Sequence, residues 1–129
     1  MNAKPAANLD ADGLPPGYPL DRDWEVTPRD VQAMRQRGDR FVLLDCRRPE
    51  EHAYARLDGA TLVPLQELPQ RVAELEAHKD ERVVVYCHHG RRSLHATALL
   101  RQAGFSNVQS MAGGIDLWSR GIDPDVPRY

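Results

Sequence analysis

Short apolar runs alternate along this chain with segments of helical periodicity, and this alternation restricts the possible folds more than any other feature. The runs carry little polar alternation, so a strand built from one of them would be covered on both faces. Four runs have this character: 41–44, 61–63, 83–86 and the residues around Val108. Helical signals occur in five segments: 28–37, 49–55, 67–77, 91–103 and 115–118. The order predicts the α/β class, with a small parallel β-sheet flanked by helices on both faces.

The first of these helices has recognisable boundaries. Thr27, Pro28 and Asp30 supply a side-chain cap, a first-turn proline and an acidic residue three positions after the cap. Gly38 is suited to the left-handed conformation in which helices commonly end. These signals predict a helix that begins directly after Thr27.

The length and composition of the chain indicate one globular domain. It has 129 residues, and 41% of them are hydrophobic. Residues 1–25 are rich in Pro, Gly, Asp and Asn, and they predict an extended N-terminal arm. Leu20 and Trp24 are the side chains through which such an arm would contact the domain. Residues 26–129 are predicted to form the folded domain.

Charge and apolar content limit the partners and the compartment. The chain has 17 basic and 19 acidic residues, and a formal net charge of −2 gives no electrostatic case for binding nucleic acid or an anionic membrane. No stretch approaches the roughly 18 apolar residues that span a bilayer, and no export signal is recognisable at the start. We therefore expect a cytoplasmic protein with no nucleic-acid and no membrane partner, in which Cys46 and Cys87 are free thiols.

The segment Cys87–Ser93, with the sequence CHHGRRS, carries the strongest chemical signal because it connects a buried strand to a helix. Ligands of parallel sheets bind at the carboxyl ends of the strands. The first amides of a helix have no partners within the helix, and a turn at Gly90 can direct further N–H groups inward. A sulfur held by such amides is favoured as an anion, with a pKa below the ordinary value of about 8.5. Cys87 is therefore the candidate nucleophile.

The charged neighbours of Cys87 suggest how the pocket binds. Arg91 and Arg92 oppose the helix dipole, which favours anions at this end. Either they hold an anion above the helix or they point into solvent, and we favour the first interpretation. Consecutive residues such as His88 and His89 seldom converge on one metal ion, so neither a metal nor a cofactor is expected. A catalytic Cys–His pair is also open, but we assign both histidines as walls of the pocket.

Five motifs, in order along the chain, resemble those of rhodanese-like domains. VVVYCHHGRRS resembles the active-site segment of that family, and DCRRPEE resembles its Asp-x-Arg-x-Pro-x-Glu stretch. A Gly-Ala pair, a Gly-Gly…Trp signature and the tail DPDVPRY, which resembles that of bacterial single-domain members and of modules fused to adenylyltransferases, complete the set. The motifs occupy residues 45–51, 59–60, 83–93, 112–118 and 123–129, and the resemblance covers roughly residues 25–129.

This resemblance implies a sulfurtransferase that works through a persulfide on Cys87. A small anionic donor such as thiosulfate would pass its outer sulfur to the Cys87 thiolate. A thiol acceptor, either a small molecule or a thioredoxin-like protein, would then remove that sulfur. Residues 88–93 would form the cradle, with Arg91 or Arg92 as the clamp on the donor.

Two other residues near the predicted site have competing interpretations. Arg47 is either a further substrate-binding residue of the pocket or the partner of Asp45 or Glu51 in a salt bridge. Cys46 is interpreted as a small buried residue, since free cysteines are often part of a core. A second interpretation makes it a resolving thiol for Cys87.

Two alternative functions remain open at this stage. A cysteine phosphatase or arsenate reductase could share the fold, but such loops place five residues between Cys and Arg, whereas four separate Cys87 from Arg92. The shorter loop favours sulfur transfer. The other alternative is a non-catalytic module for binding or regulation, and retention of Cys87 and Gly90 argues against it.

Overall fold

The computed structural model describes residues 8–129, and within this range the strands form a single parallel sheet. Their order across the sheet is β1-β5-β4-β2-β3, so β4 lies at its centre. The bounds are β1 Glu25–Val26, β2 Val42–Asp45, β3 Thr61–Leu62, β4 Val83–Tyr86 and β5 Val108–Met111. All pairings between neighbours are parallel. The prediction of a small parallel sheet is confirmed.

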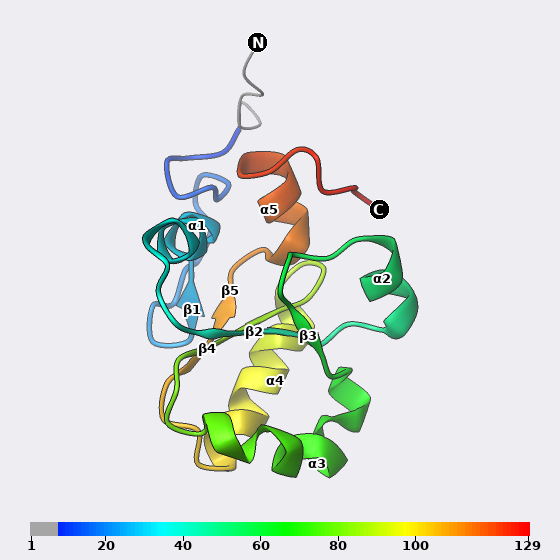
Figure 1. Cartoon of the computed structure of the whole chain (residues 1–129). Helices are drawn as coiled ribbons and strands as arrows, with labels where there is room; N and C mark the ends of the chain where they lie inside the picture. The colour runs from blue at the N-terminus through cyan, green and yellow to red at the C-terminus, as the bar shows by residue number, and fades with distance from the viewer. Residues whose placement is uncertain (1–7) are drawn as a thin grey trace.

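Helices cover both faces of this sheet, as the sequence predicts. Figure 1 shows α1 and α5 on one face and α3 and α4 on the other, with α2 to one side. The bounds are α1 Pro28–Arg37, α2 Pro49–Tyr54, α3 Leu68–Arg71, α4 Arg91–Gln102 and α5 Gly114–Gly121. None of the helices between residues 8 and 129 is long and apolar enough to cross a lipid bilayer.

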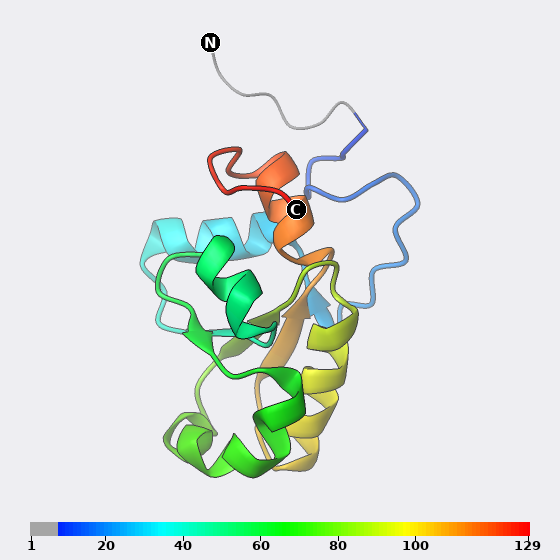
Figure 2. The ribbon, with the colours of Figure 1, turned by 90° about the vertical axis from the view of Figure 1, so that its right-hand side faces the viewer.

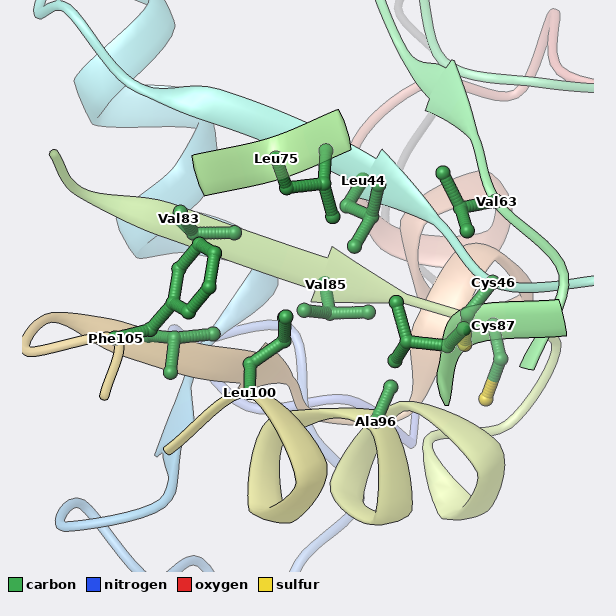
Figure 3. Close-up of a cluster of buried hydrophobic side chains, with 12 residues drawn as sticks. Leu44, Cys46, Val63, Leu75, Val83, Val85, Cys87, Ala96, Leu100 and Phe105 are labelled. Atoms are coloured by element: carbon green, nitrogen blue, oxygen red, sulfur yellow. The ribbon is translucent and has the colours of Figure 1, made fainter. Parts of the chain in front are cut away.

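Alternate residues of β4 enter different hydrophobic clusters. Val84 and Tyr86 belong to the cluster that the sheet forms with α1 and α5. Val83, Val85 and Cys87 belong to the cluster on the opposite face, which α4 covers. Figure 3 shows this second cluster, with the Cys87 sulfur close to the first turns of α4. The period of two along the strand therefore determines which face Cys87 occupies.

The prediction of one helix over 67–77 is wrong. The chain forms three short elements there, the 3₁₀ turn η1, α3 and the 3₁₀ turn η2, with bounds Leu65–Glu67, Leu68–Arg71 and Val72–His78. Pro69 lies in the first turn of α3, a position that suits proline because no helical hydrogen bond is lost there. Leu68 and Leu75 are nevertheless buried in one cluster. These turns therefore satisfy the packing without a continuous helix.

Strand β1 is an element that the sequence patterns do not reveal. It has two residues, and among residues 8–129 its one partner strand is β5, at the edge of the sheet. Its first residue, Glu25, is a buried acid whose two carboxylate oxygens accept hydrogen bonds from the Tyr18 hydroxyl and the Asp21 amide, each at 3.0 Å. A strand this short carries no periodicity, so only its tertiary pairing defines it.

The arm that precedes β1 contacts the domain over the part that the structure describes. Leu14 is buried, and Leu20 packs against the same small cluster. The Arg101 guanidinium lies over the Trp24 ring, 4.1 Å from its centroid. Residues 1–7 of the predicted arm lie outside the described residues.

The cap of α1 provides a stability test. The Thr27 hydroxyl accepts a hydrogen bond from the Asp30 amide at 3.0 Å, and the Asp30 carboxylate accepts one from the Thr27 amide at 2.9 Å. Thr27→Ser and Thr27→Ala both remove the buried methyl group, but only the alanine variant removes the cap. We expect Thr27→Ala to unfold in urea with a free energy about 1 kcal/mol below that of Thr27→Ser. Equal stability of the two variants would contradict this role of the hydroxyl.

Candidate active site

The Cys87 sulfur lies at the carboxyl end of β4, where two backbone amides point at it. The Gly90 amide donates to Sγ at 3.1 Å, and the Ser93 amide, in the first turn of α4, donates at 3.4 Å. The Ser93 hydroxyl is also 3.4 Å from the sulfur. The Cys87 residue is only 1% exposed. The sulfur is thus enclosed by hydrogen-bond donors and not by aliphatic side chains alone.

These contacts favour the thiolate form of Cys87. A hydrogen bond from the Cys46 thiol has the largest effect, and burial opposes it. Hydrogen bonds from Ser93 and Gly90 add to the effect of Cys46, and together they lower the pKa of Cys87 to about 5. An anionic sulfur is the nucleophilic form of cysteine. The site can therefore attack an electrophilic sulfur without a separate general base.

Gly90 has a backbone conformation that allows this arrangement. Its φ of 103° lies in the left-handed region, and it is the residue directly before α4. A Cβ at this position would also come within 3.2 Å of the Gly113 amide nitrogen. The conformation therefore favours glycine here, and an added Cβ would also press on the Gly113 backbone.

The N-terminus of α5 binds the other side of the loop. The Ile115 and Asp116 amides donate to the carbonyl oxygens of Cys87 and His88 at 2.8 and 3.0 Å. Gly114 makes this approach possible, because a Cβ there would lie 2.3 Å from the Cys87 carbonyl oxygen. The loop carbonyls are therefore bound by α5, and the loop amides remain available to the sulfur.

A cavity of about 240 Å³ opens above the sulfur. Its lining residues are Cys87, His88, His89, Arg91 and Arg92. Five of the predicted site residues thus share one cavity, and two others, Gly90 and Ser93, contact the sulfur directly. Figure 2 looks onto this region, where the loop before α4, helix α2 and the C-terminus come together.

Arg92 pairs with a carboxylate of α2. Its two terminal nitrogens donate to the Glu51 oxygens at 2.6 and 3.0 Å. Hydrogen bonds from Arg92 outweigh partial burial and lower the pKa of Glu51 to about 2. Glu51 therefore supplies the anion that offsets one of the two cations at the start of α4. Arg91 is exposed on the wall of the cavity.

Arg47 lies in an ion pair and does not line the cavity above Cys87, so the expectation that it binds substrate in the pocket is corrected. It is fully buried, and its Nε and Nη2 donate to the Asp45 carboxylate at 2.9 and 2.7 Å. It also donates to the Ala55 carbonyl oxygen at 2.5 Å. A buried guanidinium needs such a counter-charge and such acceptors. Of the two interpretations left open by the sequence, the structure has the salt bridge to Asp45.

Tyr129 packs against His88, one of the residues that line the cavity, and the sequence patterns did not assign it this position. Its ring stacks on His88 with centroids 4.0 Å apart and an angle of 9° between planes. Its hydroxyl accepts from Arg47 at 2.7 Å and donates to Glu51 at 2.7 Å. Burial is the main cause of a lowered pKa at His88. The tail motif was a signal for this role, but no local pattern shows where a tail folds back.

Cys46 is buried beside Cys87. It is 1% exposed and belongs to the same hydrophobic cluster, which confirms its interpretation as a small buried residue. Its thiol donates a hydrogen bond to the Tyr86 carbonyl oxygen at 3.5 Å and is the main cause of the lowered pKa of Cys87. Cys46 thus affects the candidate nucleophile directly. No group of three or more His, Cys, Asp or Glu side chains placed to hold a metal ion occurs between residues 8 and 129.

Comparison with known proteins gives a consistent result. A family model for the rhodanese-like domain matches residues 27–121. A sulfurtransferase of Allochromatium vinosum is 36% identical over 98 residues, which are 74% of this chain and 90% of that protein. The thiosulfate sulfurtransferase GlpE of Stutzerimonas stutzeri is 35% identical, with 78% and 89% covered. The probable adenylyltransferase/sulfurtransferase MoeZ of Mycobacterium tuberculosis is 33% identical over 81% of this chain, which spans only 26% of MoeZ.

Solved structures agree with the fold described above. A thiosulfate sulfurtransferase from Pseudomonas aeruginosa has a TM-score of 0.68 and 33% identity, covering 74% of this chain and 18% of that chain. The human single-domain sulfurtransferase TSTD1 has a TM-score of 0.64 and 26% identity, covering 73% and 93%. The match over residues 27–121 includes the loop Cys87–Ser93 and the two glycines that pack against it, Gly113 and Gly114. The chain therefore belongs to the rhodanese-like domain family.

Proposed function

We propose that this chain is a sulfurtransferase that moves sulfane sulfur from an anionic donor such as thiosulfate to a thiol acceptor through a persulfide on Cys87. The observation that carries the proposal is the buried sulfur with the Gly90 and Ser93 amides directed at it. The names of the relatives from Allochromatium vinosum and Stutzerimonas stutzeri are in accord with it.

The first half-reaction forms the persulfide. The Cys87 thiolate attacks the outer sulfur of thiosulfate, the S–S bond of the donor breaks, and its electron pair leaves with sulfite. The loop amides bind a sulfur anion before and after this step. Because these dipoles are already oriented, they need not reorganise during the reaction.

The second half-reaction regenerates the thiolate. An acceptor thiolate attacks the outer sulfur of the persulfide, and the electron pair of the broken bond returns to the Cys87 sulfur. The low pKa of Cys87 makes it a good leaving group for this step. A small thiol or a thioredoxin-like protein could serve as acceptor, and a reducing cytoplasm would keep both cysteines available.

The two arginines of the cavity differ in what they offer a donor. Arg92 shares its charge with Glu51 in a two-point ion pair. Arg91 is exposed on the cavity wall and keeps its charge for the incoming anion. We therefore assign attraction of the donor mainly to Arg91, and shaping of the cavity to Arg92.

The persulfide is tested by mass spectrometry of the intact protein. Exposure to thiosulfate without an acceptor is expected to add about 32 Da, one sulfur, which a thiol reductant removes. Cys87→Ser should show neither the adduct nor turnover of thiosulfate with cyanide. Absence of the adduct on the natural sequence, together with binding of a partner protein, would favour the non-catalytic module. Hydrolysis of p-nitrophenyl phosphate that depends on Cys87 would favour a phosphatase.

The low pKa of Cys87 predicts an unusual pH dependence of alkylation. A neutral reagent such as iodoacetamide should react faster as the pH rises through about 5, where the thiol loses its proton, and at a constant rate above about pH 7. An ordinary cysteine would have its inflection at about pH 8.5 and would still accelerate above it. Ser93→Ala removes one hydrogen bond to the sulfur, so its inflection should lie at higher pH. A rate that still rises between pH 7 and 9 in the natural sequence would contradict the thiolate assignment.

The role of Arg91 is tested by steady-state kinetics. Arg91→Ala should raise the KM for thiosulfate about three- to tenfold with little change in kcat, because it removes attraction for the donor and not a group that acts in the transition state. Arg40→Ala is the matched control, since this side chain is 90% exposed and lies before β2, at the opposite ends of the strands. Equal KM values for the two variants would exclude Arg91 as a donor-binding residue.

A further inference from the structure

The two cysteines follow neighbouring strands at the same level of the sheet. β2 and β4 pair in register, with Asp45 opposite Tyr86, and the next residue of each strand is Cys46 and Cys87. The Cys46 amide donates to the Tyr86 carbonyl oxygen at 3.1 Å, which continues the ladder beyond the strand ends. Figure 3 shows both sulfur-bearing side chains at one end of the same buried cluster.

This placement suits a disulfide. Neighbouring strands lie about 4.8 Å apart, and a disulfide requires a Cα–Cα separation of about 4.4–6.8 Å with side chains on one face. Both residues belong to the cluster on the α4 face. The Cys46 thiol, buried in this cluster, is also the group that lowers the pKa of Cys87 most. Because the reaction is intramolecular, the burial of Cys46 does not hinder it.

We propose that Cys46 resolves the Cys87 persulfide when no acceptor arrives, which forms a Cys46–Cys87 disulfide and releases sulfide. This inference rests on the proposed function, because the persulfide is the species that it consumes. It assigns the chain a second outcome for each sulfur that it loads: transfer to a thiol acceptor, or release as hydrogen sulfide.

The step is balanced without an external oxidant. The Cys46 sulfur attacks the inner sulfur of the persulfide, so a bond forms between the two cysteine sulfurs and the bond to the outer sulfur breaks. The electron pair of the broken bond and the thiol proton of Cys46 leave with the outer sulfur as HS⁻. Cys46 is oxidised and the outer sulfur is reduced. A dithiol reductant is then needed to restore both thiols.

The arrangement explains why Cys46 stays inert until Cys87 is loaded. In the resting site, the hydrogen bond to Cys87, burial and the charge of Cys87 all raise the pKa of Cys46 far above its ordinary value. Formation of the persulfide moves the negative charge to the outer sulfur, so the inner sulfur no longer holds the Cys46 proton. The outer sulfur can then take that proton as it leaves.

The experiment follows the full chain after loading. The protein is treated with thiosulfate under anaerobic conditions, excess donor is removed, and intact mass and free sulfide are measured over time without acceptor. The adduct of about 32 Da should give way to a species about 2 Da lighter than the reduced protein, with one sulfide released per disulfide. Peptide mapping should find Cys46 joined to Cys87, and dithiothreitol should restore the reduced mass.

Variants of Cys46 distinguish the attack of Cys46 on the persulfide from other routes by which sulfide is released. Cys46→Ala keeps a small apolar group in the core, and Cys46→Ser is a second variant in case one fails to fold. Each should retain the persulfide and release sulfide at least tenfold more slowly. Ser93→Ala is the matched control, since it also removes a hydrogen bond to Cys87 but keeps Cys46, and it should still form the disulfide. Equal release from the natural chain and both Cys46 variants would overturn the proposal.

A peroxide arm distinguishes this proposal from the proposed function. Hydrogen peroxide oxidises the Cys87 thiolate to a sulfenic acid, and the Cys46 thiol then condenses with it to the disulfide with loss of water. A disulfide from peroxide without any thiosulfate adduct would support the cysteine pairing and refute the persulfide. A stable adduct with no disulfide from either treatment would overturn the pairing and leave the sulfurtransferase assignment intact.

Discussion

The negative charge on the Cys87 sulfur is almost out of contact with water, so the protein itself must stabilise it. Transfer of an isolated charge into an apolar interior costs far more than a domain of this size can supply. Here the charge accepts hydrogen bonds from the Gly90 and Ser93 amides. These amides are free because one precedes a helix and the other lies in its first turn. The other parts of the site serve to keep this loop in one conformation.

The second glycine motif acts through the carbonyl side of the same loop. Amides at the N-terminus of α5 bind the Cys87 and His88 carbonyl oxygens, and Gly114 allows the two backbones to approach. The loop thus has its carbonyls on one helix N-terminus and its amides on the sulfur. The N-terminus of α5 thus binds the carbonyl oxygens of the loop, and the N-terminus of α4 contributes an amide to the Cys87 sulfur. This division explains why two separate glycine motifs belong to one site.

Local signals were sufficient for the central part of the site. Residues 83–93 contain a β-branched strand, a glycine turn and the start of a helix. The amide environment of Cys87 could therefore be predicted. Contacts between segments that are distant in the sequence could not be predicted. Glu51 and Arg92 are 41 positions apart in the sequence, and the Glu51–Tyr129 hydrogen bond joins residues 78 positions apart. No local periodicity predicts contacts over such separations. Strand β1 was missed for the same reason, because only its pairing with β5 defines it.

The alternation of side chains along β4 also bears on how such a chain can change in length. Because odd-numbered residues from 83 to 87 face α4 and the even-numbered ones face α1 and α5, adding or removing one residue within the strand would exchange the two faces. The Cys87 side chain would then be directed into the present surroundings of Tyr86, away from the amides of α4. Surface turns tolerate insertions and deletions, but an insertion or deletion within β4 would misplace Cys87. Across divergent relatives, gaps should accumulate in the connections remote from the loop and be excluded from β4.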